Sequence, residues 1–354
     1  MKITVPTIDF GTSKIVTMVA QSNGERCDIV GSGAVPYSGY LQDGWNNPDE
    51  IRDVIRTAID QAQKTGNCRI HELNVGVPGM FTRVIVKEVH VSLTGPDPHV
   101  TAQDVRACFK LAEESGGDRI IHSAPAWFRV DDGKKTLSPV GIKGRELSAM
   151  IALVTADKYF IDDITYRLRD MDIEPREFYS TVAGEATYAL SQDERDKTAM
   201  LIDIGYLCTD VMVMEGDALI FHKCLDIGGG HISADIAEQL NIPFPFVEEK
   251  IKQTYSFNST NQDETYVIPA TEDEPARTVR RDEVTPIIEA KVEEIAEAIN
   301  KALEEGGVKL GKWSNVYLTG GGLILNKGGK DFLAGKLHRI IRAVSYTHLT
   351  LPTI

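Results

Sequence analysis

The stretch that decides the fold reads Ile8-Asp9-Phe10-Gly11-Thr12-Ser13-Lys14-Ile15 and joins two apolar runs. The runs at 3–10 and 15–20 predict two strands connected by a tight turn. A glycine in such a turn lets backbone N–H groups approach a phosphate closely, and neighbouring hydroxyl groups add donors. Asp9, at the end of the first strand, can hold Mg²⁺ through water. Taken alone, the stretch is equally typical of an ordinary hairpin.

A second copy of this element occurs in the middle of the chain. Residues 199–204 predict a strand that ends in Asp203-Ile204-Gly205. A polar turn that carries Thr209 and Asp210 then leads into a strand at 211–214. Because both copies place Asp and then Gly at the end of a strand, they indicate an internal duplication with two similar halves.

A third glycine-rich turn, Gly320-Gly321-Gly322, follows the last predicted strand at 315–319. Glycines without side chains allow the backbone to lie flat against a purine or a ribose. A plain connection to a following helix explains this turn equally well when it is taken alone. In this order and at these separations, the three turns predict a nucleotide cleft between the two halves.

The composition excludes several other classes of protein. The net charge of −14 argues against general binding to nucleic acid or anionic lipid, and 42% hydrophobic residues are typical of a globular protein. The five cysteines include no C-x-x-C pair, and no apolar run approaches the ~20 residues that span a bilayer. Gly306–Lys312 imitates a phosphate loop but is followed by Trp313 in place of Ser or Thr, and Gly31-Ser32-Gly33 lacks the third glycine of a dinucleotide motif.

A compact inserted unit interrupts the first half. Strands are predicted at 83–93, 119–130 and 147–155, and Thr101 is expected to cap a helix between the first two strands. Before this unit, Asn47 is expected to cap a helix whose apolar face repeats every three to four residues.

Two long segments fill much of the second half. Residues 258–283 are polar and charged and predict a loop or a weak hairpin. A long helix is expected to follow, with apolar residues between 288 and 302 at alternating spacings of four and three.

Together the three turns resemble the phosphate 1, phosphate 2 and adenosine motifs of the superfamily of actin, heat-shock chaperones and sugar kinases. Within this superfamily the chain resembles the FtsA family of bacterial cell-division proteins over about residues 1–343. The inserted unit is similar to subdomain 1C of that family. The residues that carry the resemblance are 8–15, Ser38-Gly39 with Asp43-Gly44, Arg119–His122, Phe128–Asp131 and Pro139–Leu147.

The resemblance implies an α/β fold of the actin-like ATPase type, with two duplicated ribonuclease-H-like halves and an FtsA-type 1C insertion. The implied parts are subdomain 1A at 1–83 and 161–196, the SHS2-like subdomain 1C at 84–160, subdomain 2A at 197–236 and 311–343, and subdomain 2B at 237–310. Residues 344–354 resemble a translated sequencing adapter and are expected to be a non-native tail.

The resemblance also implies a site for ATP and Mg²⁺ between subdomains 1A and 2A. Asp9 and Asp203 are expected to hold the Mg²⁺ ion through water, and Glu249-x-x-Lys252 matches the nucleoside contacts of the family. The implied nucleotide-binding residues are Asp9, Gly11, Thr12, Ser13, Lys14, Asp203, Gly205, Thr209, Asp210, Gly229, Glu249, Lys252, Gly320, Gly321 and Gly322.

The phosphate 2 motif departs from the family pattern. Tyr206, Leu207 and Cys208 stand where the family has Gly-Gly-Thr. Side chains therefore replace bare backbone next to the expected phosphates, and we predict weak or absent ATPase activity. No catalytic residue is assigned.

The family forms filaments through 1C and 2B, recruits other division proteins, and binds the C-terminal peptide of FtsZ through 2B. The resemblance implies these partners, and we expect Arg280, Arg281 and Lys291 to be basic anchors for the peptide. It also implies a cytoplasmic location at the inner face of the cell membrane at the division site. The family's membrane anchor is an amphipathic helix at the far C-terminus, which we do not find here. We therefore expect the chain alone not to bind membranes. Its net charge of −14 leads us to expect no binding of nucleic acid either.

Three alternatives remain open. A pilus-assembly protein similar to PilM would be a scaffold on the same fold, although the stretch Pro139–Leu147 favours the FtsA family. A division-associated paralogue would carry a degenerate nucleotide site. A phosphotransferase of the sugar-kinase branch would need a catalytic Asp over a substrate pocket, and we find no such signature.

Overall fold

The computed structural model describes residues 3–23, 27–41, 44–117, 119–261, 263–270, 275–311 and 314–344. These residues form two compact units, the first from Met1–Ala199 with Met212–His222 and the second from Met200–Val211 with Lys223–Val344. Asp43, Trp313 and the expected tail from Ser345 onward lie outside the described residues.

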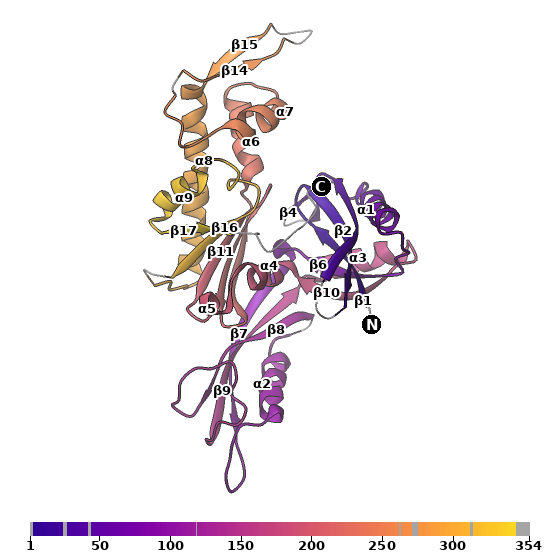
Figure 1. Ribbon diagram of the computed structural model, residues 1–354, viewed down its shortest axis with the longest axis vertical. Helices are drawn as coiled ribbons and strands as arrows, with labels where there is room; N and C mark the ends of the chain where they lie inside the picture. The colour runs from indigo at the N-terminus through magenta and orange to yellow at the C-terminus, as the bar shows by residue number, and fades with distance from the viewer. Residues whose placement is uncertain are drawn as a thin grey trace. The chain divides into compact units, whose positions relative to one another are not determined.

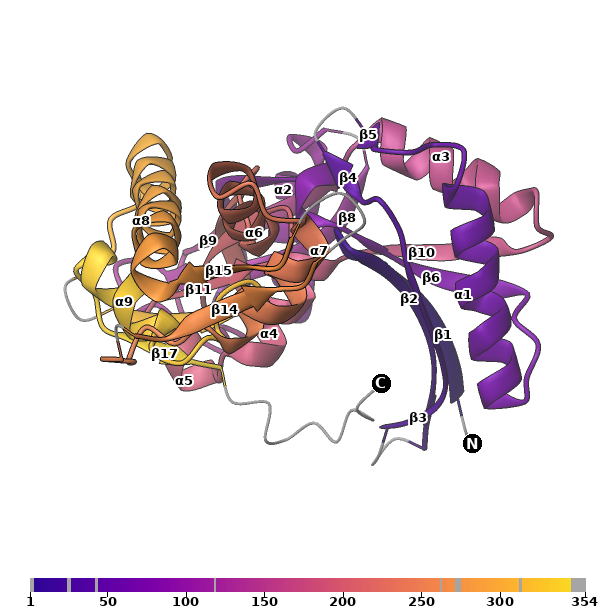
Figure 2. The same ribbon diagram turned by 90° about the horizontal axis from the view of Figure 1, so that it is seen from above.

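A five-stranded sheet forms the centre of the first unit, in the order β10-β6-β1-β2-β3 (Figures 1 and 2). The first three strands run antiparallel as a meander, whereas β6 pairs with β1 in parallel and β10 pairs with β6 in parallel. The predicted strand, turn and strand at the start of the chain are therefore confirmed. The strands are β1 (Ile3–Phe10), β2 (Lys14–Ser22), β3 (Cys27–Pro36), β6 (Glu72–Val77) and β10 (Glu174–Ser180).

Helix α1 (Ile51–Gly66) runs along β1, β2 and β3 in Figure 2 and shares one apolar core with the sheet and with α3 (Lys158–Arg169). The sequence prediction that Asn47 caps α1 is wrong, because Glu50 is the residue directly before the helix. The Asn47 amide instead donates to the carboxylate of Glu50, which also accepts two hydrogen bonds from Ser38.

Two glycines of β3 bring the sheet and α1 into backbone contact. A Cβ atom at Gly33 would lie 2.1 Å from the carbonyl oxygen of Ala58, and one at Gly31 would lie 2.5 Å from that of Ala62. Gly31-Ser32-Gly33 is therefore a helix-packing element, in agreement with its poor fit to a dinucleotide motif.

The inserted unit is a three-stranded antiparallel sheet with the order β7-β9-β8. Helix α2 packs on one face, against alternate residues of β9 such as Leu147, Ile151 and Leu153, and Figure 1 shows it beside the sheet. Thr101 caps α2 as predicted, in a capping box with Asp104. The elements are β7 (Thr82–Ser92), α2 (Ala102–Glu114), β8 (Ile120–Val130) and β9 (Glu146–Ala156).

The other face of the inserted sheet packs against the hairpin of β12 (Thr209–Glu215) and β13 (Ala218–Leu225). Trp127 and Ala218 belong to this small apolar cluster. The Lys135 ammonium lies over the Trp127 ring and pairs with Glu215 at 2.8 Å. Both faces of the inserted sheet are thus covered.

A second five-stranded sheet has the order β13-β12-β11-β16-β17. It repeats the first sheet, with β11 in the place of β1 and with β16 and β17 in the places of β6 and β10. The predicted duplication is therefore confirmed at the level of topology. Its other strands are β11 (Ala199–Ile204), β16 (Asn315–Thr319) and β17 (Ile341–Ala343), and β17 runs parallel to β16.

The remaining elements of the second unit are mostly helical. The polar segment 258–283 contains a short hairpin, β14 (Thr265–Ile268) and β15 (Arg277–Arg280), before the long helix α8 (Arg281–Glu305). Helix α9 (Gly329–Leu337) is the helix that follows the third glycine-rich turn. The other elements here are α6 (Gly229–Gln239), α7 (Phe244–Phe246) and the π-helical turn η2 (Val247–Lys252).

Short elements complete the first unit. They are β4 (Tyr40–Leu41), β5 (Gly44–Trp45), the 3₁₀ turn η1 (Gly79–Phe81), α4 (Thr181–Ala189) and α5 (Gln192–Arg195). In the part of the chain that the structure describes, no helix combines the length and apolar character needed to cross a membrane.

The close approach of β3 to α1 yields a stability prediction. We expect Gly33→Ala to lower the free energy of unfolding by about 1–3 kcal/mol, because the added methyl group would overlap the backbone of α1. Urea unfolding of the full chain measures this change. Gly184→Ala in α4 is the matched control, since open space surrounds that position and alanine favours a helix by up to about 1 kcal/mol. Equal stability of the two variants would contradict the packing role of Gly33.

Candidate nucleotide site

In the second unit, the phosphate 2 turn is bonded to the start of helix α6. The Gly205 N–H donates to the Cys208 carbonyl and closes the turn. The Gly229 N–H then donates to the Gly205 carbonyl at 2.9 Å, and the Gly230 N–H donates to the Tyr206 carbonyl at 2.7 Å. Two N–H groups at the beginning of α6 are therefore already bonded within the protein.

The adenosine turn, Gly320-Gly321-Gly322, packs directly on the backbone of Gly205 in the phosphate 2 turn and of Gly229 at the start of α6. A Cβ atom at Gly229 would lie 2.4 Å from the Cα of Gly322, and one at Gly322 would lie 2.5 Å from the Gly205 carbonyl oxygen. Gly320 has a φ of +86°, and its missing Cβ makes room for the carboxylate of Asp203. The structure thus brings together these five predicted residues, whereas Gly321 faces open space.

Tyr206 lies over the start of α6 and beside Lys252. The Tyr206 ring contacts the position of Gly230, and the Lys252 ammonium lies 5.8 Å from the ring centroid. Burial raises the pKa of Tyr206, and the nearby charge of Glu248 raises it further. The side chain that replaces a family glycine is therefore packed against protein.

Lys252 is buried and pairs with Glu248 at 3.0 Å. The Lys252 carbonyl accepts a hydrogen bond from the Asn326 amide at 2.6 Å. Glu249, which the resemblance places with Lys252, is exposed instead. Glu248 was not predicted from the sequence, although its spacing of four residues from Lys252 is typical of an ion pair on a helix.

The polar residues of β12 point in different directions. The Thr209 hydroxyl is fully buried and donates to the Ile227 carbonyl at 2.7 Å. Asp210 lies with Cys208 and Cys224 in a group whose ligand atoms are all within 4.8 Å of one another. A hydrogen bond with Cys208 and burial raise the pKa of the Cys224 thiol.

The phosphate 1 turn belongs to the first unit. The Gly11 N–H donates to the Lys14 carbonyl, and the Tyr37 hydroxyl donates to the Gly11 carbonyl at 2.7 Å. Burial raises the pKa of Asp9, whereas a backbone hydrogen bond from Phe10 and the Lys14 charge oppose this shift.

Three predicted phosphate 1 residues differ in their exposure. Thr12 is buried, whereas Ser13 and Lys14 are exposed. The Asp9 carboxylate lies at the carboxyl end of β1, the edge where α/β sheets commonly bind ligands.

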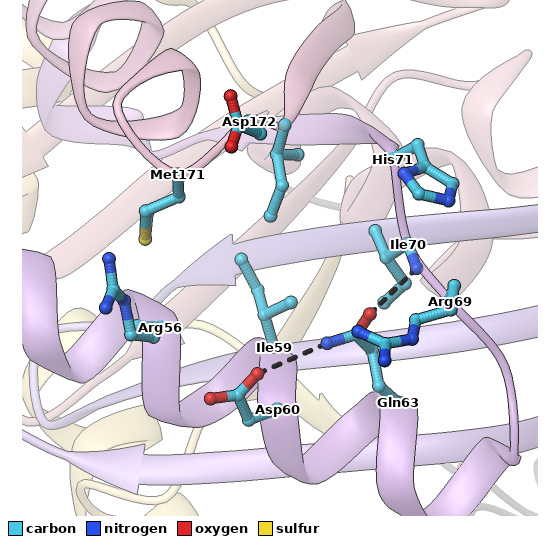
Figure 3. Close-up of a pocket in the computed structure, with 10 residues that line it drawn as sticks. Arg56, Ile59, Asp60, Gln63, Arg69, Ile70, His71, Met171 and Asp172 are labelled. Carbon is cyan, nitrogen blue, oxygen red and sulfur yellow. Dashed lines mark hydrogen bonds between the residues drawn. The ribbon is translucent and has the colours of Figure 1, made fainter.

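A polar pocket of about 370 Å³ lies at the other end of the strands of the first sheet, away from the carboxyl end of β1 (Figure 3). Arg69, Ile70 and His71 precede β6, and Met171 and Asp172 precede β10, so the pocket opens at the amino ends of these strands. It contains none of the predicted nucleotide residues.

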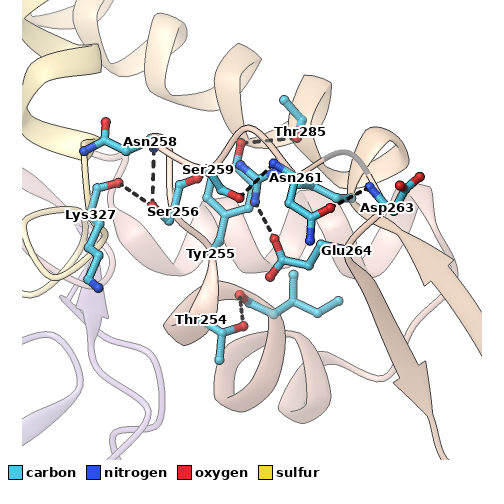
Figure 4. Close-up of polar contacts among 12 residues, drawn as sticks. Thr254, Tyr255, Ser256, Asn258, Ser259, Asn261, Asp263, Glu264, Thr285 and Lys327 are labelled. Carbon is cyan, nitrogen blue, oxygen red and sulfur yellow. Dashed lines mark hydrogen bonds and ion pairs between the residues drawn. The ribbon is translucent and has the colours of Figure 1, made fainter.

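The three predicted partner residues already have contacts within the chain. Arg281 is 3% exposed, pairs with Glu264 at 3.0 Å, donates to the Ser256 carbonyl and stacks on Tyr255. Figure 4 labels three partners of Arg281, namely Tyr255, Ser256 and Glu264, and shows the hydrogen bond from Tyr255 to Thr285.

The other two predicted anchors lie on either side of Arg281 in sequence. Lys291 is largely buried and pairs with Asp235 and Glu294. Arg280 pairs with Asp282 and Glu283, but its side chain is 61% exposed. Of the three, Arg280 is therefore the one that a partner can reach most easily.

Two family models match the chain. The model described as "Cell division protein FtsA" matches residues 200–321, and that described as "SHS2 domain inserted in FTSA" matches residues 79–155. Cell division protein FtsA of Pseudomonas aeruginosa is 26% identical over 320 residues, which cover 89% of this chain and 76% of that protein. FtsA of Bacillus subtilis is 26% identical over 85% of this chain and 70% of its own length.

Solved structures with the same fold are more distant in sequence. The PilM-PilN type IV pilus biogenesis complex matches with a TM-score of 0.63 at 17% identity, covering 97% of this chain and 88% of that chain. MreB 5 of Spiroplasma citri bound to AMPPNP matches with a TM-score of 0.55 at 10% identity, over 96% and 91% of the two chains. These similarities confirm the predicted actin-like ATPase fold.

The buried environment of Arg281 gives a testable prediction. We expect Arg281→Ala to lower the free energy of unfolding by about 2–4 kcal/mol, because it leaves Glu264 and the Ser256 carbonyl without their cationic partner. Thermal and urea unfolding measure the loss. Arg280→Ala, next in sequence but exposed, is the control and is expected to change stability by less than about 0.5 kcal/mol. If both variants unfold alike, Arg281 does not anchor this network.

Proposed function

We propose that the chain is a member of the FtsA family of cell-division proteins and acts as a nucleotide-binding scaffold that links FtsZ to the membrane and to later division proteins. The observation that carries this proposal is the pair of family matches, one in the second half and one over the inserted unit. The inserted unit matters most, because the match there is to an SHS2 domain of FtsA itself. The likeness to the PilM complex extends to the fold alone.

We propose a division of labour among the parts of the chain. The inserted unit at 84–160 and subdomain 2B at 237–310 would make the contacts between subunits of a filament, and 2B would also receive the C-terminal peptide of FtsZ. Subdomains 1A and 2A would carry the nucleotide residues. The protein would act at the inner face of the cell membrane, at the division site.

We propose ATP with Mg²⁺ as the ligand, and the residues present fit it in part. In the first unit, the charge of exposed Lys14 acts on the Asp9 carboxylate, and exposed Ser13 lies in the same turn, a combination of groups that suits phosphate oxygens and a hard cation. In the second unit, Asp203 adjoins the Gly320 turn, where open space beside Gly321 leaves backbone accessible. Mg²⁺, when bound, would neutralise phosphate charge. The MreB 5 neighbour, which carries AMPPNP, supports the same class of ligand.

The phosphate 2 turn fits a triphosphate less well, and we propose that ATP hydrolysis is weak or absent. Phosphoryl transfer needs dense donors around the β- and γ-phosphates. Here the N–H groups of Gly229 and Gly230 are bonded to carbonyls of the turn, and the Thr209 hydroxyl donates to Ile227. These donors are therefore satisfied inside the protein.

Peptide binding tests the scaffold proposal. We expect the C-terminal peptide of the host FtsZ to bind the full chain in calorimetry. Charge reversal by Arg280→Glu is expected to weaken binding by about 1–3 kcal/mol if Arg280 pairs with acidic groups of the peptide. Lys301→Glu is the control, because Lys301 is a similarly exposed cation further along α8.

The two parts of this prediction fail separately. Absence of peptide binding by the native chain would contradict the FtsZ link. Binding that Arg280→Glu leaves unchanged would remove Arg280 from the site while the link stands.

Restoring the family turn tests the nucleotide proposal. We expect the triple replacement of Tyr206, Leu207 and Cys208 by Gly, Gly and Thr to bind ATP about 10-fold more tightly, which corresponds to about one new hydrogen bond, and to hydrolyse it faster. Affinity by calorimetry and phosphate release measure the two effects. Lys134→Gly, in an exposed loop of the inserted unit, controls for added backbone freedom. The interpretation of the turn is wrong if the native chain already matches the triple variant.

A further inference from the structure

Two thiols and one carboxylate converge beside the phosphate 2 turn in the second unit. Cys208 lies directly before β12, Asp210 lies in β12, and Cys224 lies near the end of β13. One ligand atom from each of the three residues lies within 4.8 Å of the other two.

The spacing and chemistry of these atoms suit a small, soft divalent cation. Zinc binds thiolate sulfur at about 2.3 Å and carboxylate oxygen at about 2.1 Å, so neighbouring ligand atoms in a tetrahedral site lie about 3.5–3.8 Å apart. Since the three atoms lie within 4.8 Å of one another, each pair needs to move closer by about 1.3 Å at most to reach that geometry. Magnesium and calcium prefer oxygen ligands, whereas two thiolates favour zinc.

We propose that Cys208, Asp210 and Cys224 form a binding site for one zinc-class divalent cation, with water in the fourth position. The burial of the residues supports an open site of this kind. Cys208 is buried, whereas Asp210 and Cys224 are half-buried, so the three residues are not all enclosed in the core. Three protein ligands with one open position are common in zinc sites that keep a bound water.

The backbone around the cluster is fixed by a separate contact. Thr209 lies between Cys208 and Asp210, and its buried hydroxyl donates to the carbonyl of Ile227, three residues beyond Cys224. This bond ties the start of β12 to the segment that follows Cys224. The three ligands therefore sit on connected backbone, so binding requires mainly side-chain adjustment.

The presence of the Asp210 carboxylate favours cation binding by this cluster over a disulfide between its two cysteines. Binding is balanced as two thiols plus Zn²⁺ giving two zinc–sulfur bonds and two released protons, and Asp210 supplies a third bond without losing a proton. No oxidant is needed. A disulfide between Cys208 and Cys224 would require a two-electron acceptor and would give the adjacent carboxylate no role.

The site goes beyond the proposed scaffold function and does not depend on nucleotide binding. The sequence did not predict it, because Cys208 and Cys224 are separated by a hairpin and form no C-x-x-C pair. Only the pairing of β12 with β13 brings them together.

Metal titration of the untagged, reduced full chain tests the proposal. The chain is freed of metal with a chelator and titrated with Zn²⁺ against a chromophoric competitor, and released protons are counted in weak buffer. We expect one zinc per chain and two protons per zinc. Co²⁺ in place of zinc is expected to give a near-ultraviolet thiolate-to-cobalt charge-transfer band.

Variants locate the ligands. Cys208→Ser and Cys224→Ser are each expected to weaken zinc binding by at least about 100-fold, more than the loss of an outer-shell group, and Asp210→Asn by at least about 10-fold. Cys68→Ser, which removes a partly exposed thiol of the first unit, is the control and is expected to leave the affinity unchanged.

A measurement on the native chain guards against variants that fail to fold. Stoichiometric zinc is expected to slow alkylation of Cys208 and Cys224 while leaving the rate at Cys68 unchanged. The proposal is overturned if the reduced chain binds no stoichiometric zinc, or if zinc leaves the alkylation of Cys208 and Cys224 unchanged. It is also overturned if folded serine variants keep the native affinity, or if the pair forms a disulfide and the reduced form binds no zinc.

Discussion

Direct contact between backbones at Gly205, Gly229 and Gly322 is the constraint on which the candidate site of the second unit depends. A side chain at Gly229 or Gly322 would overlap a neighbouring main chain, so the end of β11, the start of α6 and the turn after β16 are brought together only by glycine. The same contacts use the first N–H groups of α6. The arrangement that assembles the glycine turns therefore also limits how many donors remain for a ligand.

The duplicated sheets explain why local sequence predicted so much of the fold. An apolar run that ends in Asp and Gly predicts a strand followed by a tight turn. Both copies of this sequence, at Asp9 and at Asp203, form such a strand and turn. The cap at Thr101 was equally local and correct. The cap expected at Asn47 was wrong because the Glu50 carboxylate binds Ser38, a partner twelve residues away.

Contacts between distant segments account for what the sequence could not reveal. Nothing near Arg281 in the chain indicates that it is buried under Tyr255 and paired with Glu264, and it therefore looked like an exposed anchor. The cluster of Cys208, Asp210 and Cys224 likewise depends on strand pairing. The pairing of Glu248 with Lys252 could have been predicted from their spacing of four residues, whereas the resemblance to the family implied Glu249.

The backbone contact of Gly31 and Gly33 with α1 has a mechanical consequence for the first unit. A helix that contacts a sheet through side chains can shift when those side chains change rotamer. Helix α1 contacts β3 at Gly31 and Gly33 through main-chain atoms, which have no rotamers to change. We therefore expect α1 and the strands that it covers to move as one rigid body. A displacement of the outer strand β3 is expected to carry α1 with it.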